Sequence, residues 1–157
     1  MKIQKILLIL LIASTLCVSA KERQSVKDDA DYMSIATLLI KDGYYQRARL
    51  TLQSVNTKIK GFNFVQFYKL QGFVSIKLKD YANAAKFFNQ SIQAGNKDKR
   101  LYIYLAQAYF KMKQYKNAID AFDDAGKLLH ENAQYYAVKI DCHWKLNEHK
   151  AALDTLD

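Results

Sequence analysis

Four lysines, each directly preceded by an apolar residue, recur along the chain at intervals of 34 to 36 residues. The four pairs are Ile40-Lys41, Ile76-Lys77, Phe110-Lys111 and Trp144-Lys145. A row of ammonium groups attracts carboxylates, while a parallel apolar row anchors hydrophobic side chains of the same partner. If the fold places the pairs side by side, they predict a surface for an acidic protein segment with apolar anchors. Trp144, the only tryptophan, is of a type favoured in binding hot spots.

Chemistry beyond binding has little support in the sequence. Cys142, His143 and His149 come closest to a metal-ligand cluster, and Cys142 and His149 are seven residues apart, a spacing compatible with one helix face. A zinc site needs three or four converging ligands, and a full set is not evident here. We therefore interpret Cys142 as a small buried thiol and His149 as a turn residue. Because the chain also lacks a glycine-rich phosphate loop and a nucleophile elbow, we expect no catalytic site, metal or cofactor.

The composition indicates one globular, helical domain. The chain has 157 residues, of which 50% are hydrophobic and 25% charged, which excludes a disordered chain. It has no proline and five glycines, too few for the many tight turns of a β-rich protein. The formal net charge of +9 favours acidic partners, anionic membrane surfaces or nucleic acid without choosing among them.

The first twenty residues, MKIQKILLILLIASTLCVSA, have the three parts of a signal peptide. Two lysines precede an apolar run from Ile6 to Leu16, and Val18-Ser19-Ala20 fits the small-residue cleavage pattern. We expect an exported protein, most readily periplasmic, with cleavage after Ala20 and a short polar linker at residues 21–28.

Two alternatives to cleavage remain open. An uncleaved signal would anchor the protein in the inner membrane, although the apolar run is shorter than the roughly 20 residues that span a bilayer. Cys17 raises the alternative of a lipoprotein, but Leu16 precedes it where a small residue is usual. Cleavage would leave Cys142 alone, so no internal disulfide would form in the mature chain.

An internal repeat extends over the rest of the chain, with units near residues 29–64, 65–98, 99–132 and 133–157. Position eight of a unit is small in the first three units, and position twenty is alanine in all four. These repeat-packing residues are Ala36, Ala48, Gly72, Ala84, Ala106, Ala118 and Ala152. Position four is tyrosine in every unit, and position twenty-four is Leu52, Phe88, Phe122 and Leu156. Three- and four-residue apolar spacing, broken by short polar turns, predicts a helix–turn–helix in each unit.

The 34-residue unit, with its aromatic and small residues at these positions, resembles the tetratricopeptide repeat (TPR). The clearest stretches are YKLQGFVSIKLKDYANAAKFFNQSI and YIYLAQAYFKMKQYKNAIDAFDDAG, and the resemblance covers about residues 29–157. The first and fourth units match less well, with Ile140 where a small residue is expected. The resemblance implies an all-α, right-handed solenoid of antiparallel helical hairpins.

The resemblance also implies that the first helix of every unit lines a concave groove. It places there the residues Lys41, Lys69, Phe73, Ile76, Lys77, Arg100, Phe110, Lys111, Trp144 and Lys145. Lys69 fits one member of the carboxylate clamp known in some TPR proteins, but Phe73 stands where that clamp needs asparagine, which disfavours a clamp. In the competing interpretation the lysine row has a structural role and binds no partner. Lysine near a helix C-terminus stabilises its helix through a favourable interaction with the helix dipole.

We expect an interaction scaffold that binds an extended or helical segment of an envelope partner, in a bacterial secretion, pilus or cell-wall machine. Three alternatives remain. In the first, the chain is an accessory module of a cell-envelope enzyme complex. In the second, it binds nucleic acid, which export disfavours. In the third, the C-terminal hairpin lacks a capping helix and self-associates through Leu153 and Leu156, unless the chain is part of a longer protein. Proximity to a membrane also remains open.

Overall fold

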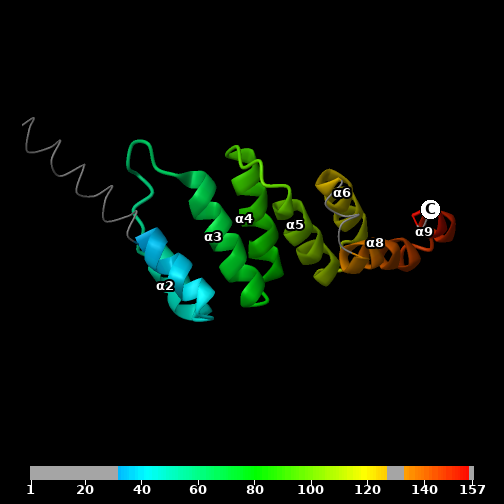
Figure 1. Ribbon diagram of the computed structural model, residues 1–157, viewed down its shortest axis with the longest axis horizontal. Helices are drawn as coiled ribbons and strands as arrows, with labels where there is room; N and C mark the ends of the chain where they lie inside the picture. Colours follow the sequence, from blue (N-terminus) through cyan, green and yellow to red (C-terminus); the bar gives the residue numbers. More distant parts are fainter. Residues whose placement is uncertain (1–31, 127–132, 156–157) are drawn as a thin grey trace, which may run out of the picture.

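The computed structural model describes residues 32–126 and 133–155, whose helices follow one another along an elongated array (Figure 1). Residues 32–41 are helical, and the helices after them are α2 (Tyr45–Gln53), α3 (Phe64–Lys77), α4 (Tyr81–Gln93), α5 (Arg100–Lys111), α6 (Tyr115–Ala125), α8 (Ala133–Lys145) and α9 (His149–Asp154). The described residues contain no strand. The expected all-α solenoid of helical hairpins is confirmed. The expected signal peptide, the linker and Leu156 lie outside the described residues.

Contacts between helices are strongest between elements adjacent in sequence. Within hairpins, α3 packs against α4, α5 against α6 and α8 against α9. Between hairpins, α2 packs against α3, α4 against α5 and α6 against α8. The second helix of one hairpin therefore covers the first helix of the next, and stability depends on these nearest-neighbour interfaces.

Each hairpin turns through one residue with a left-handed backbone. These residues occupy position fifteen of each unit: Gly43 (φ 82°), Lys79 (φ 61°), Lys113 (φ 61°) and Asn147 (φ 59°). Two residues later the second helix begins, and before α4 the Asp80 side chain accepts a hydrogen bond from the backbone N–H of Asn83 at 3.3 Å. A left-handed backbone costs a residue with a Cβ about 1–2 kcal/mol. Packing of the hairpin, rather than local preference, therefore sets the turn at the two lysines.

The small residues of the repeat lie where helices approach most closely. The following residues of this set are fully excluded from solvent or nearly so: Ala36, Ala48, Gly72, Ala84, Ala106, Ala118 and Ala152. Opposite Gly72 on α3 lies the ring of Phe88 on α4, and an added Cβ at Gly72 would lie 2.5 Å from Phe88 Cε1. Close helix approach here thus depends on the missing side chain.

An aromatic cluster of Phe73, Phe88 and Tyr104 joins three helices. The ring of Phe88 meets that of Phe73 edge-on, with 5.5 Å between the ring centres, and stacks on that of Tyr104, with 5.8 Å between the centres. The ring centres of Phe73 and Tyr104 are 4.9 Å apart. Such pairs contribute about 0.5–1.5 kcal/mol beyond their burial. The cluster therefore ties the α3–α4 hairpin to α5. Among the described helices, none has the length and apolar character needed to cross a membrane.

Candidate partner-binding groove

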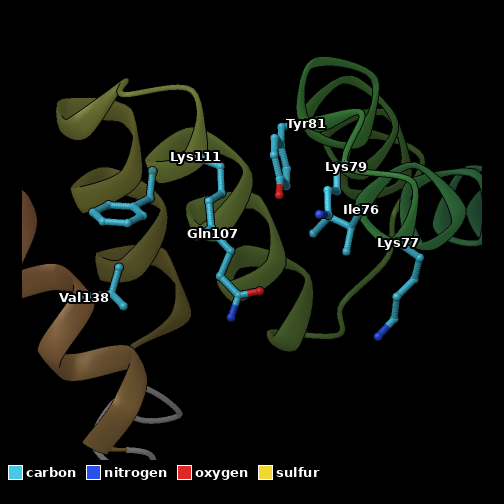
Figure 2. A pocket seen from close by; sticks show the side chains of 8 residues that line it. Ile76, Lys77, Lys79, Tyr81, Gln107, Lys111 and Val138 are labelled. Carbon is cyan, nitrogen blue, oxygen red and sulfur yellow. The ribbon is translucent and has the colours of Figure 1, made fainter.

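A groove of about 440 Å³ lies beside the ends of α3 and α5 and reaches α8 (Figure 2). It is lined by Ile76, Lys77, Lys79, Tyr81, Gln107, Phe110, Lys111 and Val138. The structure thus brings together two of the four apolar–lysine pairs, which are 34 residues apart in sequence. They meet because α3 and α5 are the first helices of successive hairpins.

The described residues that line the groove carry only positive charge. Lys77, Lys79 and Lys111 are exposed, and none of the described lining residues is acidic. In the part of the chain that the structure describes, no carboxylate forms an ion pair with any of the three. Lys77 Nζ lies 5.9 Å from the ring centre of Tyr45, and Lys111 Nζ lies 6.0 Å from that of Phe110. These contacts with aromatic faces orient the ammonium groups while leaving their charge uncompensated.

The apolar part of the groove is partly exposed. Ile76 and Phe110 are half-buried, with Ile76 packed against the core cluster that contains Phe88. The ring of Phe110 contacts that of Tyr115 at 5.9 Å, so it is held from one side. Burying the remaining area under a ligand would be favourable at roughly 25 cal/mol per Å². The groove therefore offers apolar anchoring beside unpaired positive charge.

Two of the predicted groove cations are paired within the chain instead. Lys69 Nζ lies 3.2 Å from Asp98 Oδ2, and Arg100 donates two hydrogen bonds to the same carboxylate, both at 2.8 Å. These interactions, above all the hydrogen bond from Arg100, hold the pKa of Asp98 well below its usual range. Sequence reasoning missed Asp98, because the repeat pattern has no signal for a residue in the loop before α5. Neither cation lines the groove.

Other predicted groove residues lie elsewhere. Phe73 packs in the aromatic cluster with Phe88 and Tyr104, because its helix turns that ring toward the α4–α5 side. Lys41, Trp144 and Lys145 are exposed but do not line this groove. The ring of Trp144 lies 4.4 Å from that of His149. Four of the ten predicted residues therefore line this groove: Ile76, Lys77, Phe110 and Lys111.

The cysteine and histidines of the last hairpin have separate roles. Cys142 is fully buried, and burial raises the pKa of its thiol to about 11. His143 Nδ1 lies 2.9 Å from Glu148 Oε2, across the turn between α8 and α9. Within residues 32–126 and 133–155, no three side chains of His, Cys, Asp or Glu are grouped to hold a metal ion.

Cys142 should be nearly inert in the folded protein. A rise of the pKa from 9.0 to about 11 leaves roughly 100-fold less thiolate at pH 8, and burial hinders access as well. We expect alkylation by iodoacetamide to be at least about 100-fold slower than in urea-unfolded protein, measured in a Cys17→Ser background by mass spectrometry. Similar rates in the two states would show that the thiol is accessible.

Sequence comparison identifies the family. The family described as "Anaphase-promoting complex, cyclosome, subunit 3" matches residues 77–157, about half of the chain. That segment contains α4, α5, α6, α8 and α9. None of the curated proteins gives a significant match.

Solved structures of TPR proteins share the fold. A MamA double mutant from strain RS-1 is 26% identical with a TM-score of 0.70, and residues 41 to the end of MamA from Desulfovibrio magneticus RS-1 are 25% identical with a TM-score of 0.68. Each alignment covers 82% of this chain and 71% of the other. The C-terminal TPR-containing domain of a Plasmodium falciparum FK506-binding protein is 13% identical with a TM-score of 0.69, covering 83% of this chain and 95% of that domain, which shows the fold alone.

Proposed function

The chain belongs to the family described as anaphase-promoting complex, cyclosome, subunit 3, and from its tetratricopeptide-repeat fold we propose that it is a scaffold that binds an acidic segment of a partner protein. The binding surface is the groove between α3 and α5. The observation that supports this most is a set of three exposed lysines, Lys77, Lys79 and Lys111, around partly exposed apolar side chains; no carboxylate among the described residues pairs with them.

The groove favours a ligand with both negative charge and an apolar side chain. A carboxylate that meets an exposed lysine gains little by itself, about 0.2–1 kcal/mol, because water screens the pair. Three lysines around a partly enclosed space act together, and an apolar residue seated on Ile76 and Phe110 adds burial that charge alone does not provide. An acidic segment without such a residue should therefore bind weakly.

The proposal includes export. The signal-like segment at residues 1–20 supports a location in the cell envelope, with an envelope protein as the partner. In the alternative, an uncleaved signal anchors the protein in the inner membrane. The groove is then the same, but the protein is found in the membrane fraction of the cells. Comparison of the mass of the protein from cells with that of the full chain separates the two.

Charge reversal in the groove is expected to weaken partner capture strongly. A photo-crosslinker placed at Gln107, which lines the groove, should join the tagged full chain in cells to one partner segment that is rich in Asp and Glu. The double variant Lys77→Glu and Lys111→Glu should reduce that crosslink at least about tenfold, since it replaces attraction by repulsion at two points. The product is identified by mass spectrometry of the crosslinked peptide.

The matched control reverses two exposed lysines outside the groove, Lys97→Glu and Lys116→Glu. It changes the net charge by the same amount, so an unchanged crosslink in the control assigns the effect to the groove. Circular dichroism establishes that both variants keep their helical content. If the groove variant retains the crosslink, or the captured segment is basic, the acidic-segment proposal is wrong.

A further inference from the structure

Two polar side chains that line the groove have no hydrogen-bond partner among the described residues. They are Tyr81, the first residue of α4, and Gln107 on α5, and both are half-buried. Neither forms a hydrogen bond with another residue in the part of the chain that the structure describes. Figure 2 shows the hydroxyl of Tyr81 and the amide of Gln107 directed into the space between α5 and the end of α3. The groove therefore offers hydrogen-bonding groups besides its lysines.

Gln107 has a hydrogen-bonding pattern that the lysines lack. Its amide carries N–H donors and a carbonyl acceptor side by side, whereas the ammonium groups of Lys77, Lys79 and Lys111 can only donate. An ionised carboxylate of a partner would use only the donors of the amide. A main chain can use both the donors and the acceptor, through its C=O and its N–H. The amide of Gln107 therefore suits the main chain of a partner better than its acidic side chains.

The interior of a helical partner cannot supply these main-chain groups. In an α-helix each N–H bonds to the C=O four residues earlier, so the main chain is already paired. A helix laid over the groove would cover Tyr81 and Gln107 without pairing them through its backbone, and covering an unpaired polar group costs free energy. An extended segment has an N–H and a C=O available at its residues. The groove therefore favours an extended segment.

The side chains of an extended segment alternate in a way that matches the depth of the groove. Ile76 and Phe110 are half-buried, whereas Lys77, Lys79 and Lys111 are exposed. Successive side chains of a strand point to opposite faces. When one side chain points down to the apolar pair, both of its neighbours therefore point outward, where the ammonium groups lie.

We infer that the groove binds its partner as an extended segment with the order acidic–apolar–acidic, and that Gln107 holds the main chain of this segment. The apolar side chain lies on Ile76 and Phe110, and the two flanking carboxylates meet the exposed lysines. The inference rests on the proposed function, because it assigns a conformation and a residue order to the acidic segment proposed there. It excludes a helical segment, in which the acidic residues beside the apolar one would be three or four positions away.

The conformation is tested with three labelled peptides of equal length and equal charge. The first has Ser-Glu-Leu-Glu-Ser at its centre. The second has Glu-Ser-Leu-Ser-Glu, which has the same composition but places both carboxylates on the leucine side of an extended chain. The third has glutamates four residues before and after the leucine in an alanine-rich sequence, which favours a helix. Fluorescence anisotropy during titration with the full chain should show that the first binds at least about tenfold more tightly than either of the others, because only this order pairs both carboxylates without burying them.

The outcomes separate failure of the inference from failure of the proposed function. If the helical peptide binds more tightly than the first, or if the first and second bind equally, the inference is wrong while the acidic-segment function stands. If none of the three binds, or if the binding survives Lys77→Glu with Lys111→Glu, both the inference and the proposed function are wrong.

The contact of Gln107 with the main chain is tested by an ester scan of the first peptide. Replacing a peptide N–H by an ester oxygen at each of the three central residues in turn keeps every side chain and removes one main-chain donor. Gln107→Met keeps the approximate length of the side chain and removes the amide. This variant should bind the unmodified peptide about fivefold more weakly, as expected for the loss of one hydrogen bond. One of the esters should weaken binding to the parent by a similar factor and have little further effect on the variant.

The matched control is Gln93→Met, which replaces an exposed glutamine of α4 outside the groove and should leave binding of all the peptides unchanged. Circular dichroism establishes that both variants keep their helical content. If every ester weakens binding to Gln107→Met as much as binding to the parent, Gln107 does not contact the main chain and the inference is wrong. A fivefold loss leaves the covalent capture through a crosslinker at Gln107 detectable, because crosslinked product accumulates with time.

Discussion

Replacing Phe88 with alanine is expected to lower the free energy of unfolding by about 4 kcal/mol, since Phe-to-alanine changes in cores cost about 3–5 kcal/mol. The ring is 0% exposed, lies against Gly72 of α3 and contacts the rings of Phe73 and Tyr104. Its removal leaves a cavity where three helices meet, and rigid neighbours limit collapse of that cavity. Urea unfolding followed by circular dichroism measures the loss.

The neighbouring residue provides the control. Phe87 is half-buried on the same helix and stacks on Tyr68 at 6.4 Å. Phe87→Ala removes the same side chain at the same helix propensity, so its loss of stability should be clearly smaller. Equal losses from the two variants would mean that Phe88 has no special packing role, in contradiction to the contacts that the structure shows.

Replacing Gly72 with leucine is expected to destabilise the protein by about 3 kcal/mol, at the upper end of the cost of overpacking a core. Even a Cβ would lie 2.5 Å from Phe88 Cε1, and the ring has no room to retreat from Phe73 and Tyr104. The better helix propensity of leucine offsets less than about 1 kcal/mol of this cost. The same urea titration measures the change.

A double-mutant cycle assigns the cost of Gly72→Leu to the ring. In a Phe88→Ala background the leucine enters the space that the ring vacated, so the two changes should couple favourably by about 2 kcal/mol, within the range for residues in contact. Ala82→Leu, at an exposed position of α4, controls for the added side chain and should be nearly neutral. Strict additivity of Gly72→Leu and Phe88→Ala would exclude the proposed steric conflict.

The core was predictable from sequence because its residues repeat. A small residue recurs at position eight of the first three units and an alanine at position twenty of all four, so the spacing predicts Gly72, Ala84, Ala106 and Ala118 at packed positions, and the structure buries all four. The same spacing places Ile76 and Lys77 at the end of α3 and Phe110 and Lys111 at the equivalent end of α5, and all four residues line one groove.

The rest of the groove depended on residues that do not repeat. Asp98 lies in a loop whose equivalents differ from unit to unit, and it pairs with Lys69 and Arg100. Periodicity gives a side chain its helix face but not its rotamer, so the sequence placed Phe73 in the groove while the structure packs its ring on Phe88. Tyr81, Gln107 and Val138 line the groove without any signal in the lysine row.

At Lys79, the backbone conformation of the turn and the positive charge of the groove favour different residue types. Its backbone, at φ 61°, suits glycine, the residue that the first hairpin has at the equivalent Gly43. Its side chain supplies one of the three positive charges of the groove. A change to glycine relaxes the turn and removes a cation, whereas lysine keeps the cation and the strain. At this position, the residue that best suits the backbone is glycine, whereas the residue that best attracts an acidic ligand is lysine.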